Sequence, residues 1–312
     1  MPDRRFILKI GCYYYANRTA EEIMTFPKVG GVYQFIGPKG LGKSYAAQEV
    51  SKMVLNTDNI RNHPDFFYLL QENAIGMEEI TAFEEFSKTL PAKEKIKVAV
   101  IDNADTMTVS AQNAILKLLE EGTVYMMVIL ICHGKMIPTV ESRAKKIHFF
   151  PIAEDEEREI LKNLYGDEVN PLALRLSAGK IGFYDFIIKE KAYLDTVEKT
   201  LICLAEGKKE KIFEILNLMK EKDKDNFFEM YDVEQVRAYI RFLRDVFFKV
   251  LLNISGICLE ESPSCDIAAI SEHYSILMVQ AIVSYIDKAD GLLKGGRFSK
   301  NDWFDLIRFI AE

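Results

Sequence analysis

The residues with the clearest chemical signature form one short loop, which reads GPKGLGKS from position 37. Gly37, Gly40 and Gly42 let the backbone fold into a cup of N–H groups, where a helix N-terminus favours a bound phosphate. In such a loop Lys43 would reach the outer phosphates, and the hydroxyl of Ser44 would bind magnesium. The pattern therefore predicts a site for a nucleoside triphosphate with Mg²⁺.

The flanking residues supply the context that this loop requires. The apolar run Val32–Ile36 precedes it and is typical of a strand, while Tyr45–Leu55 carries alanines and spaced aliphatic residues that suit a helix. The alternative is an ordinary glycine turn before a helix. Eight matching positions in a strand-loop-helix setting make that alternative improbable.

A second acidic position belongs to the same predicted site. Asp102 follows the apolar run Val98–Ile101 and should therefore end a buried strand. A carboxylate there can hold a water molecule of the magnesium sphere. The predicted metal-binding pair is Ser44 and Asp102, acting together with the nucleotide.

The composition of the 312 residues excludes several classes of protein. A net charge of -7 argues against a surface that grips nucleic acid everywhere. The five cysteines and four histidines are scattered, so we expect neither a zinc module nor a disulfide framework. The longest apolar run, Val124–Cys132, is far shorter than the about 20 residues that cross a bilayer. With no secretory signal in view, we expect a cytoplasmic protein without a membrane partner.

The pattern of elements predicts an α/β fold followed by helices. Five strand-like runs alternate with helical segments up to about residue 150, as a parallel sheet requires. Such a sheet binds its ligand at the carboxyl ends of its strands, where the loop and Asp102 both fall. Pro151 ends the alternation, and amphipathic helices follow. The predicted domains are residues 1–150, 151–193 and 194–312. The predicted strands are 32–36, 66–70, 97–102, 125–132 and 146–150, and the helices between them 45–55, 78–90, 110–121 and 137–143.

Several longer motifs resemble one family. Val98–Asp105 followed by Ser110–Glu121 is similar to the Walker B strand and the next helix of clamp-loader ATPases. Pro138–Arg143 resembles their serine-arginine motif. His63–Asp65, and the segment Gly76–Phe86 after it, are similar to the delta-prime subunit of bacterial DNA polymerase III. The resemblance is strong from residue 37 to residue 151 and weaker in the helical remainder.

This resemblance implies a P-loop AAA+ domain, then a small helical lid and an all-α collar that assembles a pentamer. It implies ATP with Mg²⁺ as the cofactor. The partners it implies are the other clamp-loader subunits in a hetero-pentamer and the sliding clamp. Primed DNA would be contacted through the assembled complex.

Departures from the family pattern concern hydrolysis. Asn103 stands where active relatives carry the glutamate that polarises the attacking water, and an amide cannot take that proton. Asp105 is a possible substitute, although a loop or capping acid is the favoured interpretation. The lid arginine of hydrolytic members falls at Gly182. Either Cys132 or His133 holds the sensor-1 position. The resemblance thus implies a subunit whose own ATPase is weak or absent.

Arg143 is the one catalytic candidate, and its role is implied by the resemblance. It would point into the ATP site of a neighbouring subunit, where its permanent charge would stabilise the phosphoryl group in transfer. The alternative is a surface arginine that pairs with Glu141 or caps a helix.

Two other functions stay open from the sequence. One is a gamma/tau-like clamp-loader subunit that hydrolyses ATP itself. The other is a stand-alone P-loop nucleotide switch or small-molecule kinase, which would need a substrate pocket with its own base.

Overall fold

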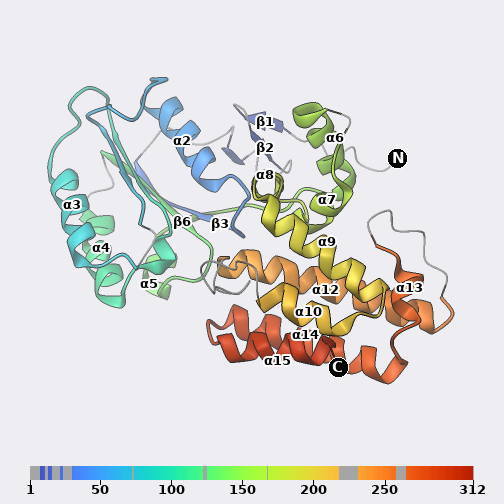
Figure 1. Ribbon diagram of the computed structural model, residues 1–312. Coiled ribbons are helices and arrows are strands. Elements are labelled where there is room, and N and C mark those ends of the chain that lie inside the picture. Colours follow the sequence, from blue (N-terminus) through green and yellow to red (C-terminus); the bar gives the residue numbers. More distant parts are fainter. Residues whose placement is uncertain are drawn as a thin grey trace. The chain divides into compact units, whose positions relative to one another are not determined.

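The computed structural model describes residues 8–10, 13–15, 22–23, 30–71, 74–121, 125–166, 168–217, 231–257 and 265–311. The chain folds into two compact units (Figure 1). Met1–Ile160 and Gly179–Phe183 make up the first unit, and the second consists of Leu161–Ala178 and Tyr184–Glu312. The predicted domain boundaries after residues 150 and 193 stay predictions.

The first unit is built on a five-stranded sheet in which every neighbouring pair is parallel. The strand order is β4-β5-β6-β3-β7. The predicted α/β fold class with a parallel sheet is confirmed. The strands are β3 (Gly31–Ile36), β4 (Phe66–Leu69), β5 (Lys97–Ile101), β6 (Met126–Cys132) and β7 (Lys145–His148).

Helices cover both faces of this sheet (Figure 1). In β5, Val98 and Val100 pack into the core that includes α2 (Lys43–Val54). Ala99 and Ile101 of the same strand point to the core on the opposite face, which includes α3 (Met77–Lys88) and α4 (Val109–Glu121). Because both faces are buried, β5 and β6 are apolar at nearly every position instead of alternating.

The His63–Asp65 motif has a structural role in this unit. The carboxylate of Asp65 accepts hydrogen bonds from the backbone N–H groups of residues 92, 93 and 94, at 2.5 to 2.8 Å. Burial acts to raise the pKa of Asp65, but these three donors hold that pKa below its ordinary value. Nδ1 of His63 accepts the N–H of Asp65 at 3.2 Å. The motif fixes the turn that leads into β5.

Near the N-terminus, β1 (Leu8–Ile10) pairs with β2 (Tyr13–Tyr15) in an antiparallel hairpin. The three consecutive tyrosines thus form a strand. Most other residues before Gly30 lie outside the described residues.

Helices make up the regular structure of the second unit, as far as the chain is described. Within the described segments, no helix combines the length and the apolar composition needed to cross a bilayer. Two helices, α6 and α8, contribute residues to both units. The helices after β7 are α6 (Glu154–Tyr165), α7 (Pro171–Ser177), α8 (Ile181–Lys189), α9 (Lys191–Ala205), α10 (Lys209–Asn217), α12 (Val233–Ile254), α13 (Ile267–Ser271), α14 (Ile276–Lys294) and α15 (Lys300–Ala311).

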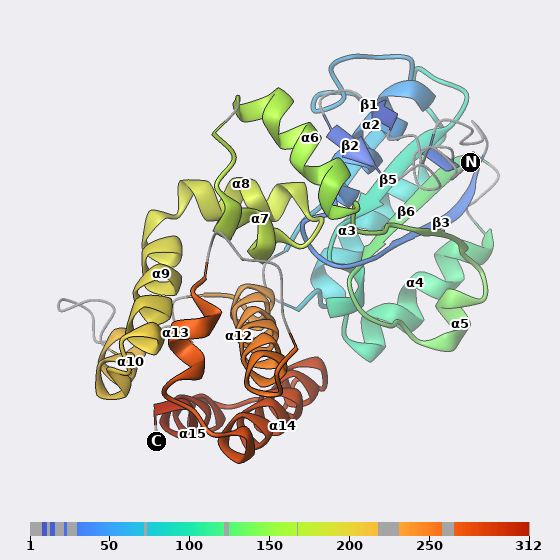
Figure 2. The same ribbon diagram turned by 90° about the vertical axis from the view of Figure 1, so that its right-hand side faces the viewer.

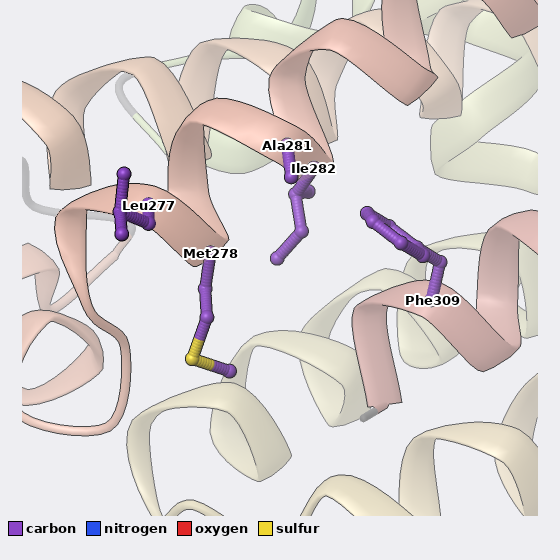
Figure 3. A pocket seen from close by; sticks show the side chains of 5 residues that line it. All are labelled: Leu277, Met278, Ala281, Ile282 and Phe309. Carbon is purple, nitrogen blue, oxygen red and sulfur yellow. The ribbon is translucent and has the colours of Figure 1, made fainter.

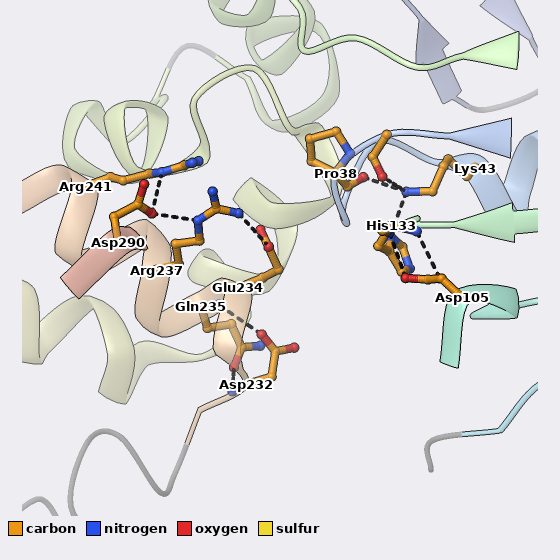
Figure 4. Close-up of polar contacts among 12 residues, drawn as sticks. Pro38, Lys43, Asp105, His133, Asp232, Glu234, Gln235, Arg237, Arg241 and Asp290 are labelled. Carbon is orange, nitrogen blue, oxygen red and sulfur yellow. Dashed lines mark hydrogen bonds and ion pairs between the residues drawn. The ribbon is translucent and has the colours of Figure 1, made fainter. Parts of the chain in front are cut away.

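The long helix α12 organises this unit and lies alongside α14 (Figure 2). Its N-terminus has a capping box, in which Asp232 accepts the N–H of Gln235 and the Gln235 side chain accepts the N–H of Asp232. Apolar residues at three- and four-residue spacing form a buried stripe along this helix: Val236, Tyr239, Ile240, Leu243, Val246, Phe247 and Val250. A row of arginines on the same helix meets two aspartates of α14. The pairs are Arg237–Asp290 (2.7 Å), Arg241–Asp290 (3.3 Å) and Arg244–Asp287 (2.5 Å), and Figure 4 shows the first two.

An apolar groove of about 400 Å³ opens between α14 and α15 (Figure 3). Its most exposed side chain is Leu277, with an exposed fraction of 77%. Leu277, Met278, Ala281, Ile282 and Phe309 line it.

Candidate nucleotide-binding site

The glycine loop connects β3 to α2, as the sequence predicts. Gly40 and Gly42 have φ angles of 87° and 73°, a region that glycine adopts without steric cost. A Cβ atom on Gly37 would lie 2.6 Å from the carbonyl oxygen of Phe149, so this position also excludes a side chain. Gly42 is the N-cap of α2, and its carbonyl accepts the N–H of Ala46 at 2.9 Å. The loop therefore places a helix N-terminus at the carboxyl edge of the sheet.

Asp102 lies directly opposite the loop. Its Oδ2 atom accepts hydrogen bonds from the hydroxyl of Ser44 at 2.6 Å and from the hydroxyl of Tyr68 at 2.8 Å. The backbone N–H of Asn103 donates to Oδ1 at 2.9 Å. Burial, and then the charge of Asp102, raise the pKa of Tyr68, so this phenol remains a proton donor. The structure brings Ser44 and Asp102 together as the sequence predicts.

The oxygen donors of this pair fit Mg²⁺. A hydroxyl and a carboxylate are hard ligands, and magnesium is usually held by one or two such groups together with phosphate oxygens and water. The described residues contain no cluster of three or more His, Cys, Asp or Glu side chains that could hold a metal ion. A hydroxyl and one carboxylate supply only part of a magnesium coordination sphere, so the pair suits an ion that arrives with a nucleotide.

Lys43 is buried beneath the loop and its ammonium meets three acceptors (Figure 4). It donates to the carbonyl oxygens of Gly37 and Pro38, both at 2.6 Å. The third contact joins Nζ to Nδ1 of His133 at 2.9 Å. Since an ammonium has three N–H donors, these three contacts use all of them.

His133 follows directly after β6 and extends the contact to Asn103. Its Nε2 atom lies 3.1 Å from Oδ1 of Asn103, while the Asn103 amide group donates to the carbonyl of Gln71 at 3.1 Å. Because the amide nitrogen is directed to Gln71, its oxygen faces the imidazole, so Nε2 carries the hydrogen and Nδ1 accepts from Lys43. Burial, and then the nearby ammonium, hold the pKa of His133 below its ordinary value, which favours this neutral form.

Asp105 holds the turn that carries the imidazole. Its carboxylate accepts the backbone N–H of His133 at 3.1 Å and that of Gly134 at 2.7 Å (Figure 4). The loop-acid interpretation of Asp105 fits these contacts. Of the two sensor-1 candidates, Cys132 is fully buried beside Gln34, whereas His133 reaches the loop lysine.

Arg143 lies apart from this network, after α5 (Pro138–Glu141). Its guanidinium donates to the carbonyl of Thr139 at 2.8 Å and forms an ion pair with Glu120 at the end of α4. Glu141, the partner suggested by the sequence, instead pairs with Lys146 at 2.8 Å. With 38% of its side chain exposed, Arg143 is an ion-paired surface residue in this chain.

Gly182, at the predicted position of the missing lid arginine, touches the loop through its backbone. Its N–H donates to the carbonyl of Gly40 at 3.2 Å. Phe183 lies close to the same glycine, since a Cβ atom on Gly40 would approach Phe183 to 3.4 Å. The segment therefore contacts the loop without providing a guanidinium at position 182.

The sequence did not single out Tyr68 as a site residue. Tyr68 lies in β4, which pairs with β5, and its ladder partner Val100 is two residues before Asp102. Tyr68 could have been placed near Asp102 only from the register of β4 against β5. That register depends on the strand order, which the sequence leaves open.

A parallel sheet with a glycine loop, a helix N-terminus and an Asp102–Ser44 pair at its carboxyl edge is the arrangement that P-loop proteins share. Comparison with known proteins shows which family within this class the chain resembles. Residues 17–153 match the model of the family described as "DNA polymerase III, delta subunit". The resemblance to the clamp-loader family of AAA+ proteins, with its delta-prime subunit, is thereby confirmed for this part of the chain.

The relatives agree with this family. The DNA polymerase III subunit delta' of Bacillus subtilis is 32% identical over 171 residues, covering 48% of this chain and 50% of that protein. Replication factor C subunit 3 of Schizosaccharomyces pombe is 29% identical over 159 residues, covering 46% of this chain and 45% of that protein. The chain thus spans about half the length of the curated relatives it matches.

A solved structure extends the fold similarity to the helices. The DNA polymerase III gamma subunit-related protein of Thermotoga maritima aligns with a TM-score of 0.56 over 94% of this chain and 98% of its own. At 16% identity this likeness concerns the fold alone.

Proposed function

We propose that this chain is a delta-prime-like clamp-loader subunit that binds ATP with Mg²⁺, hydrolyses it hardly at all, and supplies Arg143 to the ATP site of a neighbouring subunit. The observation that carries the proposal is the state of the site. The candidate magnesium ligands Ser44 and Asp102 lie within hydrogen-bond distance of each other, while the residue after Asp102 is an asparagine whose side chain is already bound to His133 and Gln71.

The nucleotide-binding part of the proposal uses the loop and its neighbours. Backbone N–H groups of Gly40 and Gly42 and the ammonium of Lys43 would hold the phosphates. Ser44 and Asp102 would hold the magnesium ion, which supplies charge neutralisation between the outer phosphates when it is bound.

The weak hydrolysis follows from Asn103. Its amide has no lone pair basic enough to take a proton from water, and general-base assistance is typically worth about 10²- to 10⁴-fold in rate. Asp105, the nearest other acid along the chain, is engaged with two backbone N–H groups. These contacts support a subunit that binds ATP and hydrolyses it slowly.

The trans role of Arg143 rests on its exposure and on the family resemblance. An arginine provides a permanent charge that stabilises phosphoryl transfer when it enters a neighbour's site. To do so, Arg143 would exchange Glu120 for the neighbour's phosphate, an exposed ion pair that costs at most about 1 kcal/mol to break.

Assembly with other subunits is supported by the helical unit. The groove between α14 and α15 exposes Leu277 and Phe309, which a partner subunit would cover. In this proposal the partners are the other clamp-loader subunits and the sliding clamp, with primed DNA contacted through the complex.

The test is reconstitution with clamp-loader motor subunits, the clamp and primed DNA. We expect the chain to join the complex and to raise its DNA-dependent ATPase, while the isolated chain turns over ATP far more slowly than the motor subunits. Fast turnover by the isolated chain that Lys43→Ala removes would instead establish the gamma/tau-like alternative. A chain that joins no complex and phosphorylates a small molecule would establish the kinase alternative.

A further inference from the structure

The ammonium of Lys43 is the group that a triphosphate needs, and it is already fully engaged. Its three N–H donors are taken by Gly37, Pro38 and His133, at 2.6, 2.6 and 2.9 Å. A phosphate oxygen can bind this ammonium only if at least one of the three acceptors releases it.

His133 is the acceptor that belongs to another part of the fold. The two carbonyl groups come from the loop itself, whereas His133 follows β6, about 90 residues further along the chain. Its contact therefore ties the loop to the opposite side of the site.

The imidazole is held in place from two directions. Asp105 fixes its backbone through the N–H groups of His133 and Gly134. Asn103 fixes the ring through Nε2, and Asn103 itself has a left-handed backbone with a φ angle of 53°, a conformation in which asparagine is several-fold enriched. The Asn103 amide is anchored in turn by Gln71. A ring so constrained keeps Nδ1 aimed at Lys43.

We propose that His133, held by Asn103 and Asp105, is an autoinhibitory latch that keeps Lys43 turned into the loop, so that ATP must displace the imidazole in order to bind. This inference rests on the proposed nucleotide site. It gives Asn103 a second role, because the residue that replaces the hydrolytic glutamate also orients the latch.

The latch predicts that removing the imidazole strengthens nucleotide binding. When only a fraction of molecules has a free lysine, the apparent dissociation constant rises by the inverse of that fraction. A hydrogen bond to a charged group is worth enough to make this factor about 10-fold or more. A histidine that instead contacts the phosphate directly would have the opposite effect on replacement.

The experiment is calorimetric titration of the isolated full chain with Mg-ATP. We expect His133→Ala to bind Mg-ATP about 10-fold more tightly than the wild type. His148→Ala, which replaces an exposed histidine at the end of β7, should leave the affinity unchanged, and Lys43→Ala in the His133→Ala background should abolish binding. Unchanged or weaker binding by His133→Ala, or no binding by either protein, would overturn the latch.

A second measurement needs no variant. The ¹⁵N resonances of the His133 ring should show a neutral, Nε2-protonated imidazole in the free protein, and the Nδ1 signal should shift when Mg-ATP is added to saturation. An Nδ1 signal that does not move at saturation contradicts the displacement. Both measurements use the isolated chain, so failure to join a clamp-loader complex would overturn the proposed function and leave the latch standing.

Discussion

At the scale of single residues, the candidate site offers oxygen ligands for magnesium but has an amide, not a carboxylate, directly after Asp102. Ser44 and Asp102 are 2.6 Å apart and offer the oxygen ligands that Mg²⁺ prefers. Asn103 next to them engages its side chain in hydrogen bonds with His133 and Gln71. A single step along the chain thus passes from Asp102, a proposed metal ligand, to Asn103, which orients the imidazole of His133.

Replacement of Ser44 by alanine should remove most of the magnesium dependence of ATP binding. In the wild type we expect Mg²⁺ to strengthen binding about 10-fold or more, and the Ser44→Ala variant to lose this gain because a ligand to a charged group is missing. Titrations with ATP in Mg²⁺ and in EDTA measure the difference. Ser87→Ala, which removes a hydroxyl bound to a carbonyl within α3, is the matched control. Full magnesium stimulation in Ser44→Ala would show that the ion is held elsewhere.

The sequence predicted the glycine loop but not the contacts of Tyr68 and His133, and the difference has a physical reason. Gly37 to Ser44 follow one another along the chain, so their spacing alone encodes the loop. The contacts of Tyr68 and His133 depend on which strands lie next to β5 and β3 and in which register. Apolar runs reveal that strands exist but not their order, so these contacts became visible only in the folded sheet.

At the scale of elements, each strand of the sheet starts and ends within two residues of its prediction. Every position of β5 and β6 is buried beneath helices, so these two strands read as nearly continuous apolar runs in the sequence. In the alternative that makes Arg143 a surface arginine, the suggested pairing with Glu141 was wrong, because Glu141 pairs with Lys146. Glu120 is 23 residues away and reaches Arg143 only because α4 ends near it.

The α12–α14 contact offers a test of how burial changes the value of an ion pair. Asp290 and Arg237 are 14% and 16% exposed, while Asp287 and Arg244 are about half exposed. Asp290→Ala should lower the free energy of unfolding by about 1 to 3 kcal/mol, because it leaves a largely buried arginine without this partner. Asp287→Ala, on the same helix, should cost less than about 1 kcal/mol. Urea denaturation measures both, and equal losses would contradict the argument from burial.

At the scale of the whole molecule, the chain combines an α/β unit with a helical unit that exposes apolar side chains. Leu277 on α14 is 77% exposed beside the groove, and Phe309 on α15 contributes a ring that stacks on Tyr285. Apolar surface of this kind commonly marks an interface. The proposed complex is the partner that would cover it.

Leu277→Glu should therefore weaken assembly with the other clamp-loader subunits. A buried charge without a partner is costly, so we expect at least a 10-fold loss of affinity. Size-exclusion chromatography and sedimentation of mixtures measure the effect. Leu90→Glu changes an equally exposed leucine, at 76%, in the first unit and is the matched control. Equal behaviour of the two variants would place the interface elsewhere.

The trans role of Arg143 is the central claim, and one measurement tests it most directly. The ATPase of the reconstituted complex, with clamp and primed DNA, is compared for the wild type, Arg143→Ala and Arg158→Ala, whose arginine is exposed on α6 and pairs within its own helix. An arginine finger is worth about 10³-fold or more at the site it enters. We predict that Arg143→Ala alone removes the contribution of one ATP site while the complex stays assembled. Unchanged ATPase in an intact Arg143→Ala complex would contradict the account.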